Sequence, residues 1–230
     1  MSKIVIFSGA GVSAESGIST FRDSDGLWEK YDIKDICTAG CLNTNREETL
    51  CFYDARRKDI EEKKPNLAHV TVAKLKSKFP DKISIITQNV DDMFEKAGCK
   101  NVLHLHGFLK EIRCMNCGYT KNIEYQKQKR DEICPACKGD FRPNIVFFGE
   151  PAPMYEKLYE ELRECKVLVV IGTSGAVINV DMLSQWAEYK ILNNLEQNNL
   201  INADSFDEVY YEKATTAILK IESSLQKFLD

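Results

Sequence analysis

Apolar runs of strand length alternate along most of the chain with longer segments of helical character. Residues 4–7 and 167–171 are continuous apolar runs, as expected for strands buried on both faces of a parallel sheet. Further strands are expected at 82–87, 101–105 and 191–194, and helices at 46–64, 67–79, 89–96, 154–165, 180–189 and 212–229. This alternation predicts an α/β fold around a parallel sheet.

A turn of small residues follows the first predicted strand directly, with the sequence Gly9-Ala10-Gly11-Val12-Ser13-Ala14. Its spacing matches the dinucleotide-binding fingerprint with alanine as the last small residue. If the turn opens a helix, free amide N–H groups would face a pyrophosphate; the turn could also be a tight strand-to-helix connection. About 20 positions further on, Tyr31, Asp32 and Asp35 provide no clean strand-end acid for the ribose, so hydride transfer is not the first expectation.

Composition argues against several classes of function. The 230 residues carry 31 Lys and Arg against 35 Asp and Glu, a net charge of −4, so the chain offers no overall basic field to a nucleic-acid backbone. No stretch approaches the roughly 18 apolar residues of a membrane span, and the first strand begins without a signal-peptide pattern. We therefore expect a cytoplasmic protein without nucleic-acid or membrane partners, whose nine cysteines are reduced.

Two Cys-x-x-Cys pairs, Cys114 with Cys117 and Cys134 with Cys137, are separated by residues 118–133. This spacing is typical of a tetrahedral zinc site. Four thiolates fill the coordination shell and leave no position for a catalytic water, so the zinc would be structural. Two other interpretations stay open, namely cysteines that pack as small apolar residues, or a redox pair, which would need to open a helix.

Five motifs follow one another along the chain, namely the glycine turn, TQNVDD at 87–92, HLHG at 104–107, the two cysteine pairs and GTS at 172–174. In this order they resemble the motifs of the sirtuins, which are NAD-dependent protein-lysine deacylases. The resemblance implies a discontinuous Rossmann-like NAD-binding domain made of residues 1–28, 67–112 and 144–230. It also implies a smaller domain, with a helical insertion at 29–66 and a zinc ribbon at 113–143. An acylated lysine would enter the cleft between them.

His106 is the candidate catalytic base. The alternation of residue types puts His104 and His106 on one side of a strand, and His106 directly precedes Gly107 at the expected strand end. Its ordinary pKa suits a base near neutral pH. By resemblance, the acyl oxygen attacks C1′ of the nicotinamide ribose, and His106 then deprotonates a ribose hydroxyl, which leads to free lysine and O-acyl-ADP-ribose. His104 and His69 are expected to be ordinary core or surface histidines.

The resemblance also assigns the cofactor contacts. Gln88, Asn89 and Asp91 match the nicotinamide-side motif, with Asn89 grouped with His106 as catalytic. A local alternative is that Asn89 caps a helix and Asp91 stabilises its first turn. The other cofactor-binding residues are Gly9, Ala10, Gly11, Ser13 and Ala14 of the turn, Phe21 and Arg22 of the next loop, Gly172, Thr173 and Ser174 at phosphate and ribose, and Asn194, Leu195, Glu196 and Ala214 at the adenosine.

Tyr53 and Arg56 lie three residues apart and hence on one face of the predicted helix at 46–64. They resemble the Tyr-x-x-Arg pair of class III sirtuins. A guanidinium can bind a terminal carboxylate with two hydrogen bonds and a phenol adds a third, which favours succinyl, malonyl or glutaryl lysine over acetyl lysine. The alternative is a solvated helix face, because several neighbours are charged. Cys37 stands where these relatives often have alanine in the acyl pocket.

The segment 144–150 resembles the one with which sirtuins pair the backbone of their substrate, with Val146, Phe148 and Gly149 as substrate contacts. After GTS, residues 179–181 depart from the usual Pro-Ala pair of the family. The expected protein is thus a lysine deacylase with NAD as co-substrate, one structural zinc and acylated lysine in proteins as substrate. Two alternatives are a mono-ADP-ribosyltransferase and a non-catalytic NAD- or peptide-binding module; the presence of His106, Asn89 and Asp91 argues against the second.

Overall fold

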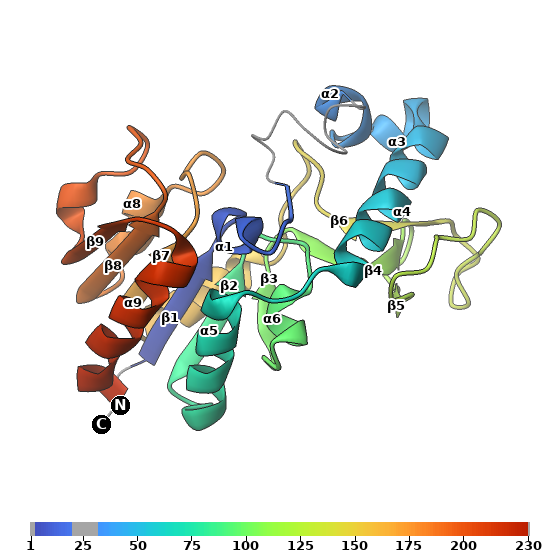
Figure 1. Ribbon diagram of the computed structural model, residues 1–230. Coiled ribbons are helices and arrows are strands. Elements are labelled where there is room, and N and C mark those ends of the chain that lie inside the picture. Colours follow the sequence, from blue (N-terminus) through green and yellow to red (C-terminus); the bar gives the residue numbers. More distant parts are fainter. Residues whose placement is uncertain (1–2, 20–31, 230) are drawn as a thin grey trace.

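The computed structural model describes residues 3–19 and 32–229 (Figure 1). Its main sheet has six parallel strands, in the spatial order β3 (Val102–His104), β2 (Ile83–Thr87), β1 (Lys3–Ser8), β7 (Cys165–Ile171), β8 (Tyr189–Asn194) and β9 (Glu208–Tyr211). Counted along the chain, this order reads 3-2-1-4-5-6, which is the Rossmann order. The strand order reverses between β1 and β7, where such sheets bind ligands at their carboxyl edge.

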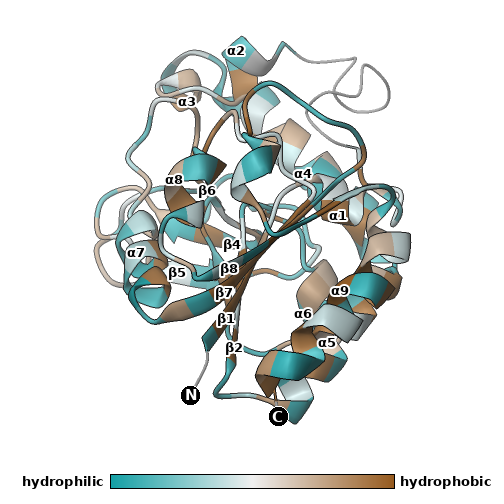
Figure 2. Cartoon of the chain, turned by 90° about the vertical axis from the view of Figure 1, so that its left-hand side faces the viewer, coloured by the Kyte–Doolittle hydropathy of each residue, from teal (hydrophilic) through white to brown (hydrophobic). Residues whose placement is uncertain are grey.

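Helices cover both faces of this sheet (Figure 2). One face is covered by α5 (Leu67–Lys78), α6 (Met93–Lys96) and α9 (Ala214–Leu229), and the other by α7 (Tyr155–Arg163) and α8 (Val180–Ser184). The apolar side chains of α9 recur at helical spacing and are buried, namely Ala217, Ile218, Ile221, Leu225 and Leu229. The central strands are apolar on both sides because both sides are covered.

A smaller unit lies beside the main sheet (Figure 1). It contains an antiparallel sheet in the order β5 (Thr120–Asn122), β4 (Gly107–Cys114) and β6 (Phe141–Ile145), with α2 (Ile33–Ile36), α3 (Cys41–Thr44) and α4 (Arg46–Glu62). The remaining elements are α1 (Gly11–Ala14) and the 3-10 helix η2 (Ala203–Ser205). The small sheet extends beyond 113–143 on both sides, while the division into two domains stays a prediction.

A buried network of ion pairs and hydrogen bonds ties α4 to β4 and to the loop after β5. Arg57 is fully buried and pairs with Asp54, and it donates hydrogen bonds to the carbonyl oxygens of Leu109 (3.2 Å) and Gln126 (3.1 Å). Asp54 also pairs with Arg130 at 2.9 Å. A buried charge is tolerated only with such partners. This network therefore fixes the orientation of α4, and with it the direction in which the face with Tyr53 and Arg56 points.

Three expectations about elements are wrong or incomplete. The predicted helix at 89–96 begins only at Met93, and Asn89 is not its cap, because the Asn89 side chain bonds to Ser13 instead. The helix expected at 180–189 ends at Ser184, since Tyr189 already begins β8. β4 and β9 were not expected. Among the described residues, no helix is long and apolar enough to cross a membrane.

Candidate functional site

The loops that follow β1 and β7 pack against each other at the switch point of the sheet. The amide of Gly9 donates to the carbonyl of Ile171 (3.0 Å), and the amide of Gly11 donates to the carbonyl of Gly172 (2.8 Å). A Cβ on Gly11 would lie 2.7 Å from Cα of Gly172, and Gly172 itself has a φ of 65°. The glycines are therefore required by the contact between the two loops, in addition to any contact with a phosphate.

Polar side chains from three segments meet beside the packed loops that follow β1 and β7. Asn89 donates to Oγ of Ser13 (3.1 Å), and Gln88 donates to Oγ1 of Thr173 (2.9 Å). The ring of His69 contacts the same Ser13 oxygen through Nε2 at 3.3 Å. The structure thus brings Ser13, Gln88, Asn89 and Thr173 together at the carboxyl edge of β1, β2 and β7.

His69 was expected to be an ordinary histidine, but it supports this cluster. The amide of Asn66 donates to its Nδ1 (3.3 Å), so the ring proton sits on Nε2 and is donated to Ser13. His69 is fully buried, and burial lowers its pKa to about 4, so the ring is neutral. A sequence signal existed, because Asn66 and His69 are the first and last residues of a capping box at the start of α5.

Asp91 lies within the electrostatic reach of both Ser13, in α1, and Arg56, in α4. Its Oδ1 accepts the amide of Met93 at 3.1 Å. Burial raises the pKa of Asp91, against the hydrogen bonds from Met93 and Ser13 and the positive charges of His104 and Arg56. Asp91 therefore has two hydrogen-bond donors, Met93 and Ser13, and two positively charged neighbours.

His106 lies two residues beyond the end of β3, in the connection to β4. Its Nδ1 contacts the carbonyl of Gln88 at 3.0 Å, and since a carbonyl only accepts, Nδ1 carries the proton. Nε2 then has the lone pair of a base and lies 3.0 Å from the hydroxyl of Tyr155. Burial lowers the pKa of His106, with the Gln88 carbonyl opposing, so the neutral ring can accept a proton.

His104 has the opposite character. Its Nδ1 contacts the carbonyl of Asn89 (2.9 Å) and its Nε2 a carboxylate oxygen of Glu95 (2.9 Å), so both nitrogens donate. Burial alone would lower the pKa of His104, but the hydrogen bond and charge of Glu95 outweigh it and the pKa is raised. A protonated His104 holds the Asn89 loop against α6 and cannot act as a base.

Tyr53 and Arg56 lie on the buried face of α4, not on a solvated one. Tyr53 is 5% exposed, its ring stacks on Phe147 with 5.7 Å between centroids, and its hydroxyl lies 3.3 Å from Sγ of Cys37. Arg56 is 8% exposed; burial lowers its pKa, while the charges of Tyr53 and Asp91 raise it. A guanidinium stays protonated in proteins, so α4 presents a positive charge beside Cys37, Tyr53 and Asp91.

The segment 144–150 begins in β6 and then bonds to the connection between β3 and β4 and to the loop between α2 and α3. The amide of Val146 donates to the carbonyl of His106 (2.9 Å), so Val146 retains only its carbonyl for a peptide. The amide of Phe148 donates to the carbonyl of Cys37 (2.8 Å) and its carbonyl accepts the amide of Ala39 (2.8 Å), while the residue as a whole is 47% exposed. Gly149 follows with a φ of 85°. The backbone of Phe148 is therefore already bonded on both sides and is not available to a peptide.

The predicted adenosine residues lie at the far end of the same edge. Asn194 ends β8 and is buried, Leu195 is 65% exposed, and Ala214 begins α9. Glu15, directly after α1, accepts the amide (3.0 Å) and hydroxyl (2.8 Å) of Thr215. Phe21 and Arg22 lie outside the described residues.

The departure at 179–181 has a local explanation. Asn179 caps α8 by accepting the amide of Met182 at 3.0 Å, and Asp181 accepts the amide of Asn202 at 3.0 Å. The loop after GTS therefore ends in a regular capped helix.

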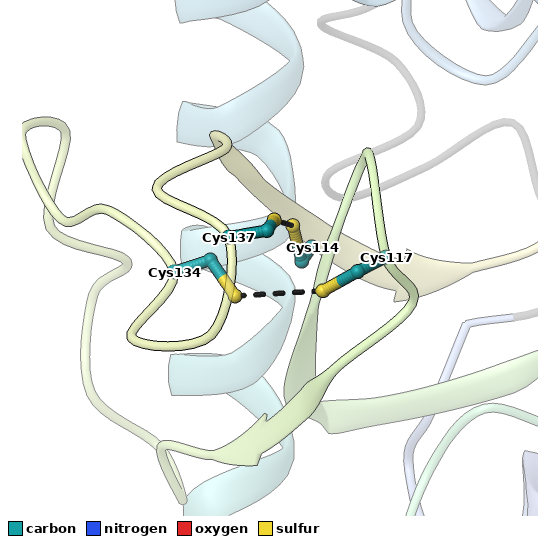
Figure 3. A group of neighbouring side chains, drawn as sticks. All are labelled: Cys114, Cys117, Cys134 and Cys137. Atoms are coloured by element: carbon teal, nitrogen blue, oxygen red, sulfur yellow. Dashed lines mark hydrogen bonds between the residues drawn. The ribbon is translucent and has the colours of Figure 1, made fainter.

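The four cysteines of the paired motifs converge beside β4 and β6 (Figure 3). Their sulfur atoms all lie within 4.8 Å of one another, with 3.4 Å between Cys114 and Cys137 and 3.6 Å between Cys117 and Cys134. A tetrahedral zinc with Zn–S bonds of about 2.3 Å places sulfur atoms about 3.8 Å apart. The cluster therefore fits a four-thiolate zinc site.

Comparison with known proteins gives one consistent result. The model of the Sir2 family matches residues 9–179. An NAD-dependent protein deacylase of Campylobacter jejuni subsp. jejuni is 47% identical over 231 residues, which cover 100% of this chain and 98% of that protein. The solved complex of a Sir2 homologue with NAD superimposes with a TM-score of 0.85 at 32% identity, covering 99% of this chain and 91% of the other. A Sir2 variant with a deacetylated p53 peptide and 3′-O-acetyl ADP-ribose gives a TM-score of 0.78 at 28% identity, covering 96% and 93%.

Proposed function

The chain belongs to the Sir2 family, the sirtuins, and on that premise we propose that it removes acyl groups with a terminal carboxylate, such as succinyl and malonyl, from protein lysines. NAD-dependent protein deacylation is the activity for which its relatives are named. The acidic preference and the products, free lysine and O-acyl-ADP-ribose, are our proposal.

One observation carries the acyl preference, namely the buried guanidinium of Arg56. Arg56 is buried beside Tyr53, and a carboxylate at the end of the acyl chain would bring an opposite charge that a guanidinium can bind with two hydrogen bonds. The hydroxyl of Tyr53 bonds to a thiol, which is a weak partner that a carboxylate can replace. An acetyl group offers Arg56 and Tyr53 no such charge.

We propose the following roles for the other side chains. NAD supplies the ribose carbon to which the acyl oxygen is transferred as nicotinamide leaves. His106 is neutral with its lone pair on Nε2, and it accepts the proton of a ribose hydroxyl there. Asn89 and Asp91 are held by Ser13 and Met93 where they can orient the nicotinamide ribose. The four-cysteine zinc site lies on the small sheet and is structural.

The test compares matched acetyl- and succinyl-lysine peptides by mass spectrometry of all products, with wild type and Arg56→Met. We expect the ratio of succinyl to acetyl kcat/KM to fall about 10- to 100-fold, because a hydrogen bond to a charged group contributes about 1.5–3 kcal/mol. Lys58→Met is the matched control, since this lysine lies on the same helix with its side chain 69% exposed. An unchanged ratio in Arg56→Met would refute the acidic preference.

The same measurement separates deacylation from the transfer of ADP-ribose to protein. A deacylase converts NAD into nicotinamide and O-acyl-ADP-ribose only when an acyl peptide is present. Label from the adenosine that remains on protein would instead indicate a mono-ADP-ribosyltransferase.

A further inference from the structure

The hydroxyl of Tyr155 contacts Nε2 of His106, the atom that would accept a proton in the proposed reaction. Tyr155 is the first residue of α7 and is half-buried, with its ring centroid 6.0 Å from that of His106. Its oxygen lies 3.0 Å from Nε2 of His106.

The direction of this hydrogen bond follows from the other side of the imidazole ring. Nδ1 of His106 must donate to the Gln88 carbonyl, so a neutral ring can only accept at Nε2. Burial raises the pKa of Tyr155, which keeps the phenol protonated and able to donate. The phenol O–H therefore occupies the single in-plane lone pair with which His106 would act as a base.

A ribose hydroxyl that is to be deprotonated must make the same kind of bond, an O–H donated to Nε2. The phenol and the ribose hydroxyl are both O–H donors, and the one lone pair on Nε2 cannot accept a full hydrogen bond from both at the same time. The phenol of Tyr155 thus holds the imidazole of His106 in one orientation and tautomer before ligand binds. Its hydrogen bond to Nε2 must break when the ribose hydroxyl binds there.

We propose that Tyr155 is a positioning residue that acts through His106, holding Nε2 in the unliganded enzyme until a ribose hydroxyl replaces the phenol. This inference rests on the role of His106 in the proposed function. It concerns the binding step, so it can be tested without turnover.

The first test is a double-mutant cycle on ADP-ribose binding, measured by calorimetry. In Tyr155→Phe we expect ADP-ribose to bind about two- to tenfold more tightly than in wild type, because the ligand no longer displaces an intramolecular hydrogen bond. In a His106→Ala background the same substitution should have no effect. Tyr159→Phe, one turn further along α7, is the control and should match wild type.

The second test uses the fact that the chain has only three histidines. In ¹⁵N spectra, Tyr155→Phe should move the Nε2 signal of His106 in the free protein and leave those of His69 and His104 in place. At saturating ADP-ribose the His106 signals of wild type and variant should coincide, because the phenol is displaced in both.

Three results would overturn the inference. They are unchanged or weaker ADP-ribose binding in Tyr155→Phe, the same effect of that substitution with and without His106, and a His106 signal that differs between the two proteins when ligand is bound. None of these readouts requires deacylation. Loss of the proposed activity and failure of the Tyr155 inference are therefore distinguishable.

Discussion

The three histidines differ in protonation because their partners differ. His69 is buried against neutral groups and stays neutral, His104 donates from both nitrogens and is protonated, and His106 donates to one carbonyl and keeps a basic nitrogen. Sequence alone singled out His106 by its motif, but it could not show that His69 supports Ser13. That role depends on a contact between residues 56 positions apart.

His69 should make the protein sensitive to acid. Its pKa is about 4 in the folded state against 6.5 for the ordinary group. Above pH 6.5 it is neutral in both states and has no effect. As the pH falls from 6.5 towards 4, only the unfolded chain takes up the proton, and up to about 3 kcal/mol of stability is lost.

Urea unfolding between pH 7.5 and 4.5 checks this expectation. In His69→Gln the stability should fall less steeply with acid than in wild type, whatever its value at pH 7.5. Equal slopes in the two proteins would contradict the assignment. His104, whose raised pKa gives a contribution that is lost as the pH rises above 6.5, is common to both and cancels.

At the scale of elements, long helical patterns and continuous apolar runs predicted helices and strands correctly, whereas the single capping signal at Asn89 did not. The helix predicted at 46–64 is α4 (Arg46–Glu62), and the apolar run at 167–171 is the core of β7. β4 and β9 were missed because they are short of continuous apolar residues, the one lying in the small sheet and the other at an edge. Asn89 was considered as a helix cap, but its side chain donates to the hydroxyl of Ser13, which is 76 positions away in the sequence.

The small sheet should depend on a bound zinc ion. Its apolar cluster contains Ile112, Cys114, Cys134 and Phe141, so two of the four members belong to the four-cysteine cluster that fits zinc. We expect zinc chelation, or Cys134→Ser, to speed amide hydrogen exchange throughout 113–143 and to leave β1 and β7 protected.

Cys51→Ser serves as the control, because this exposed thiol lies outside the cluster. Chelation that leaves exchange in the small sheet unchanged would show that the cysteines do not stabilise it through a metal.

At the scale of the whole molecule, the contact between the loops after β1 and β7 joins the two halves of the main sheet. Gly11→Ala should therefore abolish ADP-ribose binding and lower the melting temperature, because the new Cβ would meet backbone at 2.7 Å that cannot move aside. Gly98→Ala is the comparison, since an added Cβ there meets nothing within 4 Å and costs only the strain of its φ of 100°, about 1 kcal/mol.

Differential scanning fluorimetry and calorimetric titration of both variants test this. If the two alanine variants had the same melting temperature and the same affinity for ADP-ribose, the close contact between the two loops would not be needed for stability or binding.

The site as a whole was predictable only as a set of residues. Motifs and helical spacing indicated the glycine turn, the cysteine pairs and the Tyr53–Arg56 pair, because each is defined by local order. The packing of one glycine loop on the other, the charge of Asp91 near Arg56 and the hydrogen bond from Tyr155 to His106 all join distant segments. Such contacts follow from topology, which local spacing does not encode.

Two hydrogen bonds of His106 described above have a mechanical consequence. The carbonyl of His106 is bonded to Val146, which follows the small sheet, while its ring is bonded to Gln88, which follows a strand of the large sheet. If the two sheets separate, this residue must either rotate its ring or break one of these bonds. The bond to Gln88 is the one that keeps the proton on Nδ1, so a separation of the sheets that broke it would also release the tautomer in which Nε2 is basic.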